Sequence, residues 1–325
     1  MIPAHTARVA SWLAAAAAAL AILSAVGPAP AQAGPVPAQA GPALAQIRAA
    51  APAAGPPDIV TAPTLIASTA AGAVGYREVG TGSPVLLIMG FGGSMDNWAP
   101  SFVDALATRH TVVVFDNAGI GGTAALPAPL SISAMAGQTS ALITALHLGR
   151  TTVLGWSMGG MIAQALAALD PRQVSQLILA ATQAGTGASL PIPAAAAAAL
   201  ASSDPATVLS VLFPPDQAAA AGSYLTGILQ YPGFYGATAA VKTEQTAAIQ
   251  QWMAGDDPAG RQLSRIRART LVADGTLDQL DPVPNDQLLA RGIPRALLLL
   301  YPDAGHAFLF QDAAQFVPAI ERFVR

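Results

Sequence analysis

The feature that most constrains this sequence is a G-x-S-x-G pentapeptide extended by one more glycine, at residues 155–160. An apolar run precedes it and a helix-forming run follows, which predicts a strand, a sharp turn and a helix with Ser157 at the tip. A side chain at Gly155 or Gly159 would clash across so tight a turn. The Ser157 hydroxyl is then expected over the helix N-terminus, where free N–H groups and the helix dipole favour developing negative charge.

The composition sets broad limits on the kind of protein. Apolar residues make up 53% of the 325 residues and charged residues only 10%, which allows one large α/β domain with an insertion. The net charge of −3 gives no electrostatic surface for nucleic acid, so we expect no such partner. The absence of cysteine excludes disulfides, thiolate nucleophiles and cysteine-based zinc sites.

The N-terminus has the order of a secretory signal peptide: a polar start, an apolar stretch (residues 9–26) and an A-x-A cleavage signal at residues 31–33. The signal recurs at residues 38–40, so the cut could follow Ala33 or Ala40. An uncleaved anchor is the alternative, because the apolar stretch nearly spans a bilayer. Weakly hydrophobic alanines and the prolines that follow favour cleavage. We therefore expect a secreted or periplasmic protein with no stable membrane anchor.

The rest of the chain divides into a spacer and a folded region. After the expected signal peptide (1–33), residues 34–58 are rich in Pro, Ala and Gly and predict an extended linker. Apolar runs typical of buried parallel strands then alternate with helical runs, which predicts an α/β fold with a doubly wound, mostly parallel sheet opened by a hairpin. The expected strands are 65–69, 74–79, 85–89, 112–115, 153–156, 177–181, 270–273 and 296–301, and the expected core helices are 98–108, 131–146, 158–169 and 312–323.

The stretch between residues 181 and 270 is far too long for one crossover connection. Its helical runs predict an inserted helical cap, residues 183–265, over the carboxyl ends of the strands, with 59–182 and 266–325 as the core. The larger apolar side chains of this cap either line a substrate pocket or pack inside it, and we expect packing for most of them. They are Leu212, Phe213, Tyr224, Leu225, Tyr231, Phe234, Tyr235 and Trp252.

A serine nucleophile needs a base, and the sequence offers four histidines. His5 leaves with the signal peptide, His110 opens a strand at the opposite end of the sheet, and His147 ends a helix at that same end. His306 follows the last strand on a loop at a carboxyl end, where catalytic groups gather in open α/β sheets. Elimination therefore assigns the base to His306, against the alternative of a loop histidine without a catalytic role.

Three aspartates after the strand at 270–273 compete to orient this histidine. Asp274 is expected to end the strand or to cap the turn. Asp278 follows the tight turn of Gly275 in a G-x-x-D-x-x-x-P pattern, which favours it as the orienting carboxylate. Asp281 is a lesser candidate, because it could instead cap the next helix.

The developing oxyanion needs two backbone donors. We expect one from the Met158 N–H, after the nucleophile, and the other from the Phe91 N–H in the glycine-rich loop 89–93. Such a loop can also cradle phosphate, but it lacks both the P-loop lysine and the Rossmann glycine spacing. No His, Asp or Glu cluster shows metal-ligand spacing, so we expect no metal and no cofactor.

Together, from residue 59 to 325, these motifs resemble the α/β-hydrolase fold with a helical cap. The motifs are 89–93, 115–121, 155–160, 275–282 and 305–306. The chain order Ser157, Asp278, His306 is that of the family's triad. Two departures stand out: Met89 where relatives usually have His, and Ala118 where they often have Arg. The first is expected to remove a loop-ordering hydrogen bond, and the second an ion pair near the active-site floor.

The resemblance implies two-step acyl transfer on a small or medium, mostly apolar ester or lactone. Members with caps include carboxylesterases, enol-lactonases, carbon–carbon bond hydrolases and cofactor-free haloperoxidase-like perhydrolases, and the motifs do not separate them. A serine at position 157 argues against haloalkane dehalogenases and epoxide hydrolases, which need an aspartate there. A secreted ligand-binding protein that kept the fold is the alternative outside the enzymes.

Overall fold

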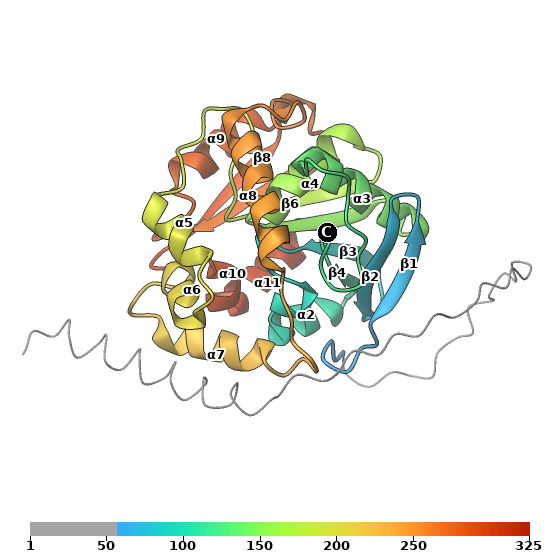
Figure 1. Ribbon diagram of the computed structural model, residues 1–325, viewed down its shortest axis with the longest axis horizontal. Coiled ribbons are helices and arrows are strands. Elements are labelled where there is room, and N and C mark those ends of the chain that lie inside the picture. Colours follow the sequence, from blue (N-terminus) through green and yellow to red (C-terminus); the bar gives the residue numbers. More distant parts are fainter. Residues whose placement is uncertain (1–56) are drawn as a thin grey trace, which may run out of the picture.

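The computed structural model describes residues 57–325, so the predicted signal peptide and almost all of the predicted linker lie outside the described residues. One sheet of eight strands runs through this part of the chain in the order β1-β2-β4-β3-β5-β6-β7-β8 (Figure 1). The first two pairings are antiparallel and the others parallel. The strands are β1 (Leu65–Thr69), β2 (Gly72–Val79), β3 (Ser83–Ile88), β4 (His110–Phe115), β5 (Thr151–Trp156), β6 (Val174–Ala180), β7 (Arg269–Gly275) and β8 (Ala296–Tyr301).

Helices cover both faces of the sheet. Alternate side chains of each strand enter opposite cores, so that in β3 Val85 and Leu87 belong to one core and Leu86 and Ile88 to the other. The first core includes α2 (Pro100–Ala107) and α11 (Ala313–Phe323), and the second includes α3 (Ile132–Ala145), α4 (Met158–Leu169) and α9 (Pro284–Gly292). The prediction of a doubly wound, mostly parallel sheet is therefore confirmed.

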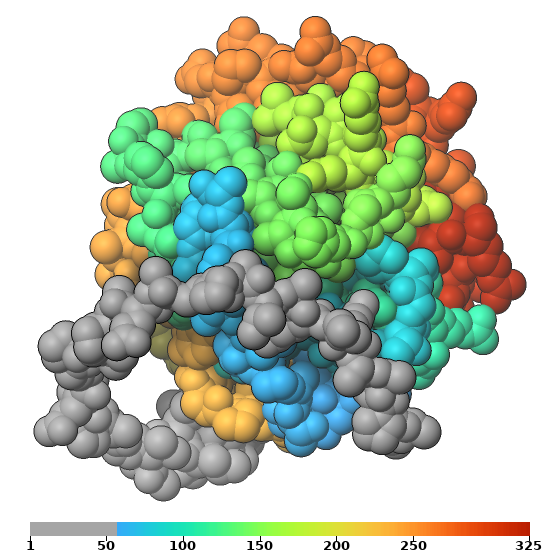
Figure 2. Space-filling view, turned by 90° about the vertical axis from the view of Figure 1, so that its right-hand side faces the viewer, coloured from blue at the N-terminus to red at the C-terminus, as the bar shows by residue number. Residues whose placement is uncertain are grey.

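One edge of this sheet is formed by the antiparallel hairpin of β1 and β2. Figure 2 faces this edge and shows the hairpin (blue) at the surface of the molecule. β1 packs beside α3, while Leu65 and Ile66 are 43% and 56% exposed. The hairpin thus closes one side of the sheet, away from the loops that carry the predicted site.

Four helices lie between β6 and β7, within the segment predicted as the cap. They are α5 (Ala194–Leu200), α6 (Pro205–Leu212), α7 (Ala218–Ile228) and α8 (Ala239–Ala254). The Asp204 carboxylate caps α6, the Thr238 hydroxyl caps α8, and Gly255 ends α8 at a φ of 78°. The confirmed fold thus has an inserted helical cap, while its predicted domain limits remain predictions.

The remaining elements are short. They are η1 (Met95–Asn97), η2 (Leu263–Arg265) and α10 (Phe308–Gln311), which precedes α11. The helix predicted over residues 312–323 corresponds to α11. None of the helices in residues 57–325 is both long and apolar enough to cross a bilayer.

Candidate active site

Ser157 occupies the turn between β5 and α4 in a conformation that few side chains adopt. Its φ is 57° and its ψ is −123°, and its N–H donates to the carbonyl oxygen of Ala180 at 2.9 Å. A Cβ on Gly155 would lie 2.2 Å from the carbonyl oxygen of Gly159, and a Cβ on Gly159 would lie 2.0 Å from that of Ile88. The ends of β3, β5 and α4 come so close together here that both positions must be glycine. This crowding forces the sharp turn that presents Ser157.

His306 and Asp278 lie on the loops after β8 and β7 and contact each other directly. His306 Nδ1 lies 2.6 Å from Asp278 Oδ2, and both side chains are buried. The other carboxylate oxygen, Oδ1, accepts the N–H groups of Leu280 at 2.6 Å and Asp281 at 2.9 Å. Among the described residues no hydrogen bond joins the Ser157 hydroxyl to the His306 ring, although both line one pocket. In substrate-free enzymes such bonds are often long.

The competing aspartates have other partners. Asp274 Oδ1 accepts the N–H of Gly275 at 2.6 Å, so this carboxylate caps the turn. Asp281 Oδ1 accepts the side-chain amide of Asn285 at 2.9 Å, and α9 begins at Pro284 without a side-chain cap. Neither Asp274 nor Asp281 is hydrogen-bonded to a histidine.

The other described histidines lie away from this pocket. His110 opens β4, where its ring nitrogens lie 2.9 Å from the Ser83 hydroxyl and 3.0 Å from a Glu321 carboxylate oxygen. His147 follows α3 with a φ of 53°. Of the histidines in residues 57–325, only His306 lines the pocket with Ser157.

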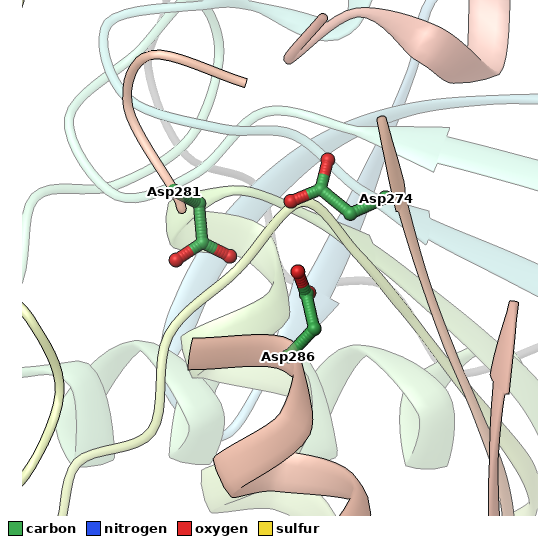
Figure 3. A group of neighbouring side chains, drawn as sticks. All are labelled: Asp274, Asp281 and Asp286. Carbon is green, nitrogen blue, oxygen red and sulfur yellow. The ribbon is translucent and has the colours of Figure 1, made fainter. Parts of the chain in front are cut away.

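Next to Asp278, three further aspartates point their carboxylates at one another (Figure 3). They are Asp274, Asp281 and Asp286; all are buried, and one oxygen of each lies within 4.8 Å of the others. Burial, and then the negative charges of neighbouring aspartates, raise the pKa of all three carboxyl groups, that of Asp286 to about 8. The spacing of these residues in the sequence does not mark them as a cluster, because it is the packing of β7, its loop and α9 that brings them together.

The loop predicted to supply an oxyanion donor lies against the turn of Ser157. A Cβ on Gly90 would lie 3.1 Å from Ser157 Cβ, so only glycine lets the two backbones approach so closely. In the described part of the chain, no acceptor is bonded to the N–H of Phe91 or of Met158. Both donors therefore remain available beside Ser157.

This loop is held from two sides. The Asn117 side-chain amide, after β4, donates to the carbonyl oxygen of Met89 at 2.8 Å. On the other side, the Gly92 N–H donates to Gln245 Oε1 of α8 at 2.8 Å, and the Gly92 carbonyl accepts the Ala237 N–H at 3.0 Å. These bonds order the loop although Met89 replaces the usual histidine.

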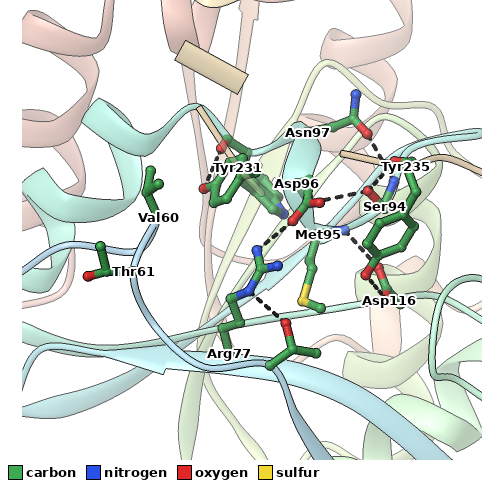
Figure 4. Close-up of polar contacts among 12 residues, drawn as sticks. Val60, Thr61, Arg77, Ser94, Met95, Asp96, Asn97, Asp116, Tyr231 and Tyr235 are labelled. Carbon is green, nitrogen blue, oxygen red and sulfur yellow. Dashed lines mark hydrogen bonds and ion pairs between the residues drawn. The ribbon is translucent and has the colours of Figure 1, made fainter. Parts of the chain in front are cut away.

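A buried ion pair lies beneath the same loop. The Arg77 guanidinium of β2 pairs with Asp96 of η1 and lies 5.1 Å from the centre of the Tyr231 ring (Figure 4). The Arg77 guanidinium thus has its partners within the protein and joins β2 to η1 and to the cap segment that carries Tyr231.

Asp116 joins the floor of the site to the cap. Its two oxygens accept the Met95 N–H at 2.8 Å and the Tyr235 hydroxyl at 2.6 Å (Figure 4). Burial raises the pKa of Asp116 to about 6, and these two hydrogen bonds oppose the rise. The Ser94 hydroxyl adds a bond of 2.6 Å to the Tyr235 carbonyl oxygen. The cap segment around Tyr235 is thus fixed to the end of β4.

A pocket of about 190 Å³ lies between the loops at the strand ends and the cap helices. Its lining is chiefly apolar. The basic side chains in the lining are His306 and Lys242 of α8. The lining residues are Met89, Gly90, Phe91, Gly92, Gly93, Asn97, Trp156, Ser157, Leu200, Val208, Leu212, Tyr224, Phe234, Gly236, Lys242 and His306. Three of the eight cap side chains singled out in the sequence therefore line the pocket, and the other five do not.

A smaller cavity of about 30 Å³ lies on the α4 side of the same centre. Phe91, Ser157 and His306 border both cavities. Ser157 therefore lies between a larger and a smaller cavity.

Three residues at the site escaped the sequence reasoning. Asn117 and Gln245 are polar residues in a loop and on a helix, and nothing in the sequence marks their hydrogen bonds to the 89–93 loop. Lys242 did have a signal, because it is the only lysine in the sequence.

Comparison with known proteins agrees with this architecture. The family model described as "alpha/beta hydrolase fold" matches residues 83–313. The chain is 29% identical over 246 residues to "Putative carbamate hydrolase RutD" of Pseudomonas savastanoi pv. phaseolicola, covering 72% of this chain and 91% of that one.

Two further similarities are to a depolymerase and to an esterase. The chain is 27% identical over 253 residues to a poly(3-hydroxyalkanoate) depolymerase of Ectopseudomonas oleovorans, covering 75% of this chain and 84% of that one. The structure of a thermophilic esterase from Thermogutta terrifontis matches with a TM-score of 0.63 at 25% identity, covering 81% of this chain and 98% of that one.

Proposed function

The chain belongs to the alpha/beta hydrolase fold family, and from this premise we propose that it is a serine hydrolase that cleaves carboxylic esters or lactones. The observation that carries the proposal is the 2.6 Å contact between His306 Nδ1 and Asp278 Oδ2, in a pocket that Ser157 also lines. In this proposal Ser157 is the nucleophile, His306 the base and Asp278 the carboxylate that fixes the histidine tautomer.

Acylation begins when His306 Nε2 takes the proton of the Ser157 hydroxyl as Oγ attacks the substrate carbonyl carbon. The carbonyl oxygen becomes an oxyanion, and the free N–H groups of Phe91 and Met158 stabilise it. The protonated His306 then gives its proton to the leaving alkoxide, and the carbon–oxygen bond of the ester breaks. Asp278 stabilises the imidazolium during this step.

Deacylation repeats the sequence with water. His306 Nε2 takes a proton from a water molecule, whose oxygen attacks the acyl carbon. The second tetrahedral intermediate collapses, Ser157 Oγ recovers the proton from His306, and the carboxylic acid leaves. With a lactone, the alcohol and the acid are released as one hydroxy acid.

The substrate class follows from the pocket and from the relatives. A chiefly apolar lining favours small or medium substrates with a mostly apolar acyl part. The names of two similar proteins, an esterase and a poly(3-hydroxyalkanoate) depolymerase, support ester hydrolysis. We further propose that the protein is exported, on the basis of the N-terminal sequence pattern.

The test is hydrolysis of p-nitrophenyl esters from acetate to palmitate by the wild type and by Ser157→Ala. We expect turnover with an optimum at short or medium chains, and a loss on the order of 10³-fold or more in Ser157→Ala. The matched control is Ser101→Ala, which removes the exposed hydroxyl of a serine on α2.

Activity that survives in Ser157→Ala would refute the nucleophile. A folded wild type that hydrolyses no ester and no lactone of the series would refute the proposed substrate class. Peracid formation from acetate and hydrogen peroxide, measured on the same preparations, separates a perhydrolase from an esterase.

A further inference from the structure

The pocket contains an unexplained positive charge. Lys242 is the only lysine in the sequence. Lys and Arg together number 15, so the other fourteen are arginines. It lies on α8 and lines the same pocket as Ser157 and His306. Within the described residues no Asp or Glu lines this pocket, so no carboxylate of the lining faces Lys242.

The side chain of Lys242 lies along the loop that holds the predicted oxyanion donor. Gly92 has a φ of +68°, and a Cβ placed there would lie 3.0 Å from Lys242 Cε and 3.7 Å from its Cδ and Cγ. The glycine thus makes room for the aliphatic part of the lysine, which is half-buried. The carbon that carries the ammonium group therefore lies beside Gly92, which directly follows Phe91.

The ammonium group has no protein partner among residues 57–325. The ion pairs of the described chain are Arg77–Asp96, His110–Glu321, Arg261–Asp256 and His306–Asp278, and no side-chain hydrogen bond of Lys242 exists there. Glu244, the nearest acidic residue in the sequence, is exposed and lies two positions along the helix, on a different face. An ammonium group that lines a pocket and has no counter-ion can form a charge-assisted hydrogen bond with an anion from outside the protein.

We propose that Lys242 binds a carboxylate of the substrate, so that the preferred substrates are esters or lactones that carry one anionic group. This inference rests on the proposed ester hydrolysis and narrows its substrate class. The apolar lining holds the carbon chain, and the ammonium group pairs with a carboxylate placed beside the oxyanion loop. The expectation of a mostly apolar substrate then applies to the carbon chain between the ester group and the carboxylate.

The test compares two esters of equal length. In mono-p-nitrophenyl adipate a terminal carboxylate replaces the terminal methyl group of p-nitrophenyl hexanoate. We expect the wild type to prefer the adipate ester in kcat/KM, and the ratio of the two values to fall about tenfold in Lys242→Met. Lys242→Arg, which keeps the charge, should retain most of the preference. The matched control is Arg265→Met, which removes one exposed positive charge on η2.

An unchanged ratio in Lys242→Met would overturn the inference, while Ser157-dependent hydrolysis of both esters would leave the proposed function intact. If the wild type hydrolyses neither ester, the proposed ester hydrolysis fails, and calorimetric binding then decides the role of Lys242. Monomethyl adipate should bind Ser157→Ala more tightly than methyl hexanoate does, and this difference should vanish in Ser157→Ala/Lys242→Met. Equal binding of monomethyl adipate to both variants would refute the carboxylate site.

Discussion

Asp278 and Asp286 are the same residue type within one loop and helix, yet their surroundings give them opposite properties. Asp278 accepts two backbone N–H groups and contacts His306, so both of its carboxylate oxygens have partners. Both oxygens of Asp286 are buried without a hydrogen-bond donor, and burial raises its pKa to about 8. One carboxylate is thus available to orient a histidine, and the other holds a proton at neutral pH.

Asp286 should make the stability of the protein depend on pH. In the folded protein it stays protonated up to about pH 8, whereas an unfolded chain loses this proton near pH 4. Its contribution to the unfolding free energy is therefore complete only below about pH 4 and is lost as the pH rises toward 8. Asp286→Asn, which never ionises, should be more stable than the wild type by up to about 5 kcal/mol at pH 8 and by about 1 kcal/mol at pH 5.

Urea unfolding at the two pH values measures this difference. Asp216→Asn is the control, because it removes a carboxylate that is exposed in the folded protein. A gain in Asp286→Asn that is the same at pH 5 and pH 8 would contradict the assignment of the proton to Asp286.

At the residue scale, the sequence predicts those site residues that lie in a short motif directly after a strand. Ser157, Asp278 and His306 each follow a strand within a short, glycine-containing motif. The structure places Ser157 and His306 in one pocket and Asp278 against His306. The acidic cluster was not predictable, because no spacing rule says that Asp286 on α9 turns back toward Asp274. Lys242 likewise reaches the pocket only through the packing of α8 on Gly92.

At the element scale, the loop after β3 depends on α8 of the cap. Gln245 is fully buried, its Oε1 accepts the Gly92 N–H, and its Nε2 has no partner among the described residues. Gly92 directly follows Phe91, the residue expected to donate to the oxyanion. A side chain that fixes Gly92 therefore also fixes the direction of the Phe91 N–H.

We expect Gln245→Leu, which has no acceptor, to lower kcat about tenfold with a smaller effect on KM, because the oxyanion exists only after substrate binds. Gln245→Glu keeps an acceptor and should retain more of the activity. Steady-state kinetics with the best p-nitrophenyl ester measures both, and Gln250→Leu, at an exposed position of α8, is the control. Equal losses in Gln245→Leu and Gln245→Glu, or a loss in KM alone, would argue against this positioning role.

The elements themselves were largely predictable. Each expected strand corresponds to one observed strand, and β1 and β8 have the expected limits. Continuous apolar runs identify buried parallel strands well, since both faces of such a sheet are covered. The start of β6 was placed too late, at 177 instead of 174, because Ser175 and Gln176 interrupt the apolar run.

At the scale of the whole molecule, the fold followed from the alternation of strands and helices, but the attachment of the cap did not. The contacts of Asp116 with Tyr235 and of Gly92 with Gln245 join residues more than a hundred positions apart. Such pairs have no local signature in a single sequence. They become visible only when the inserted helices are placed over the strand ends.

Export is also a property of the whole molecule. If the N-terminal pattern is a cleaved signal peptide, the mature protein should begin at residue 34 or 41 and appear outside the cytoplasm. Mass spectrometry of the intact mature protein measures its N-terminus, and Ala31→Lys combined with Ala38→Lys should block both cleavages. An N-terminus at Met1 in the exported protein would support the uncleaved anchor instead.

The attachment of the cap through Tyr235, Ala237 and Gln245 has a consequence for protein engineering. In a hydrolase with an independent lid, the lid can be exchanged between homologues to transfer substrate preference. Here the inserted segment also holds the backbone of the 89–93 loop beside Ser157, so a chimera whose foreign cap lacks these contacts should lose catalytic rate as well as change its substrate preference. Substitutions in the core and in the inserted helices of this protein are therefore expected to accumulate together during evolution.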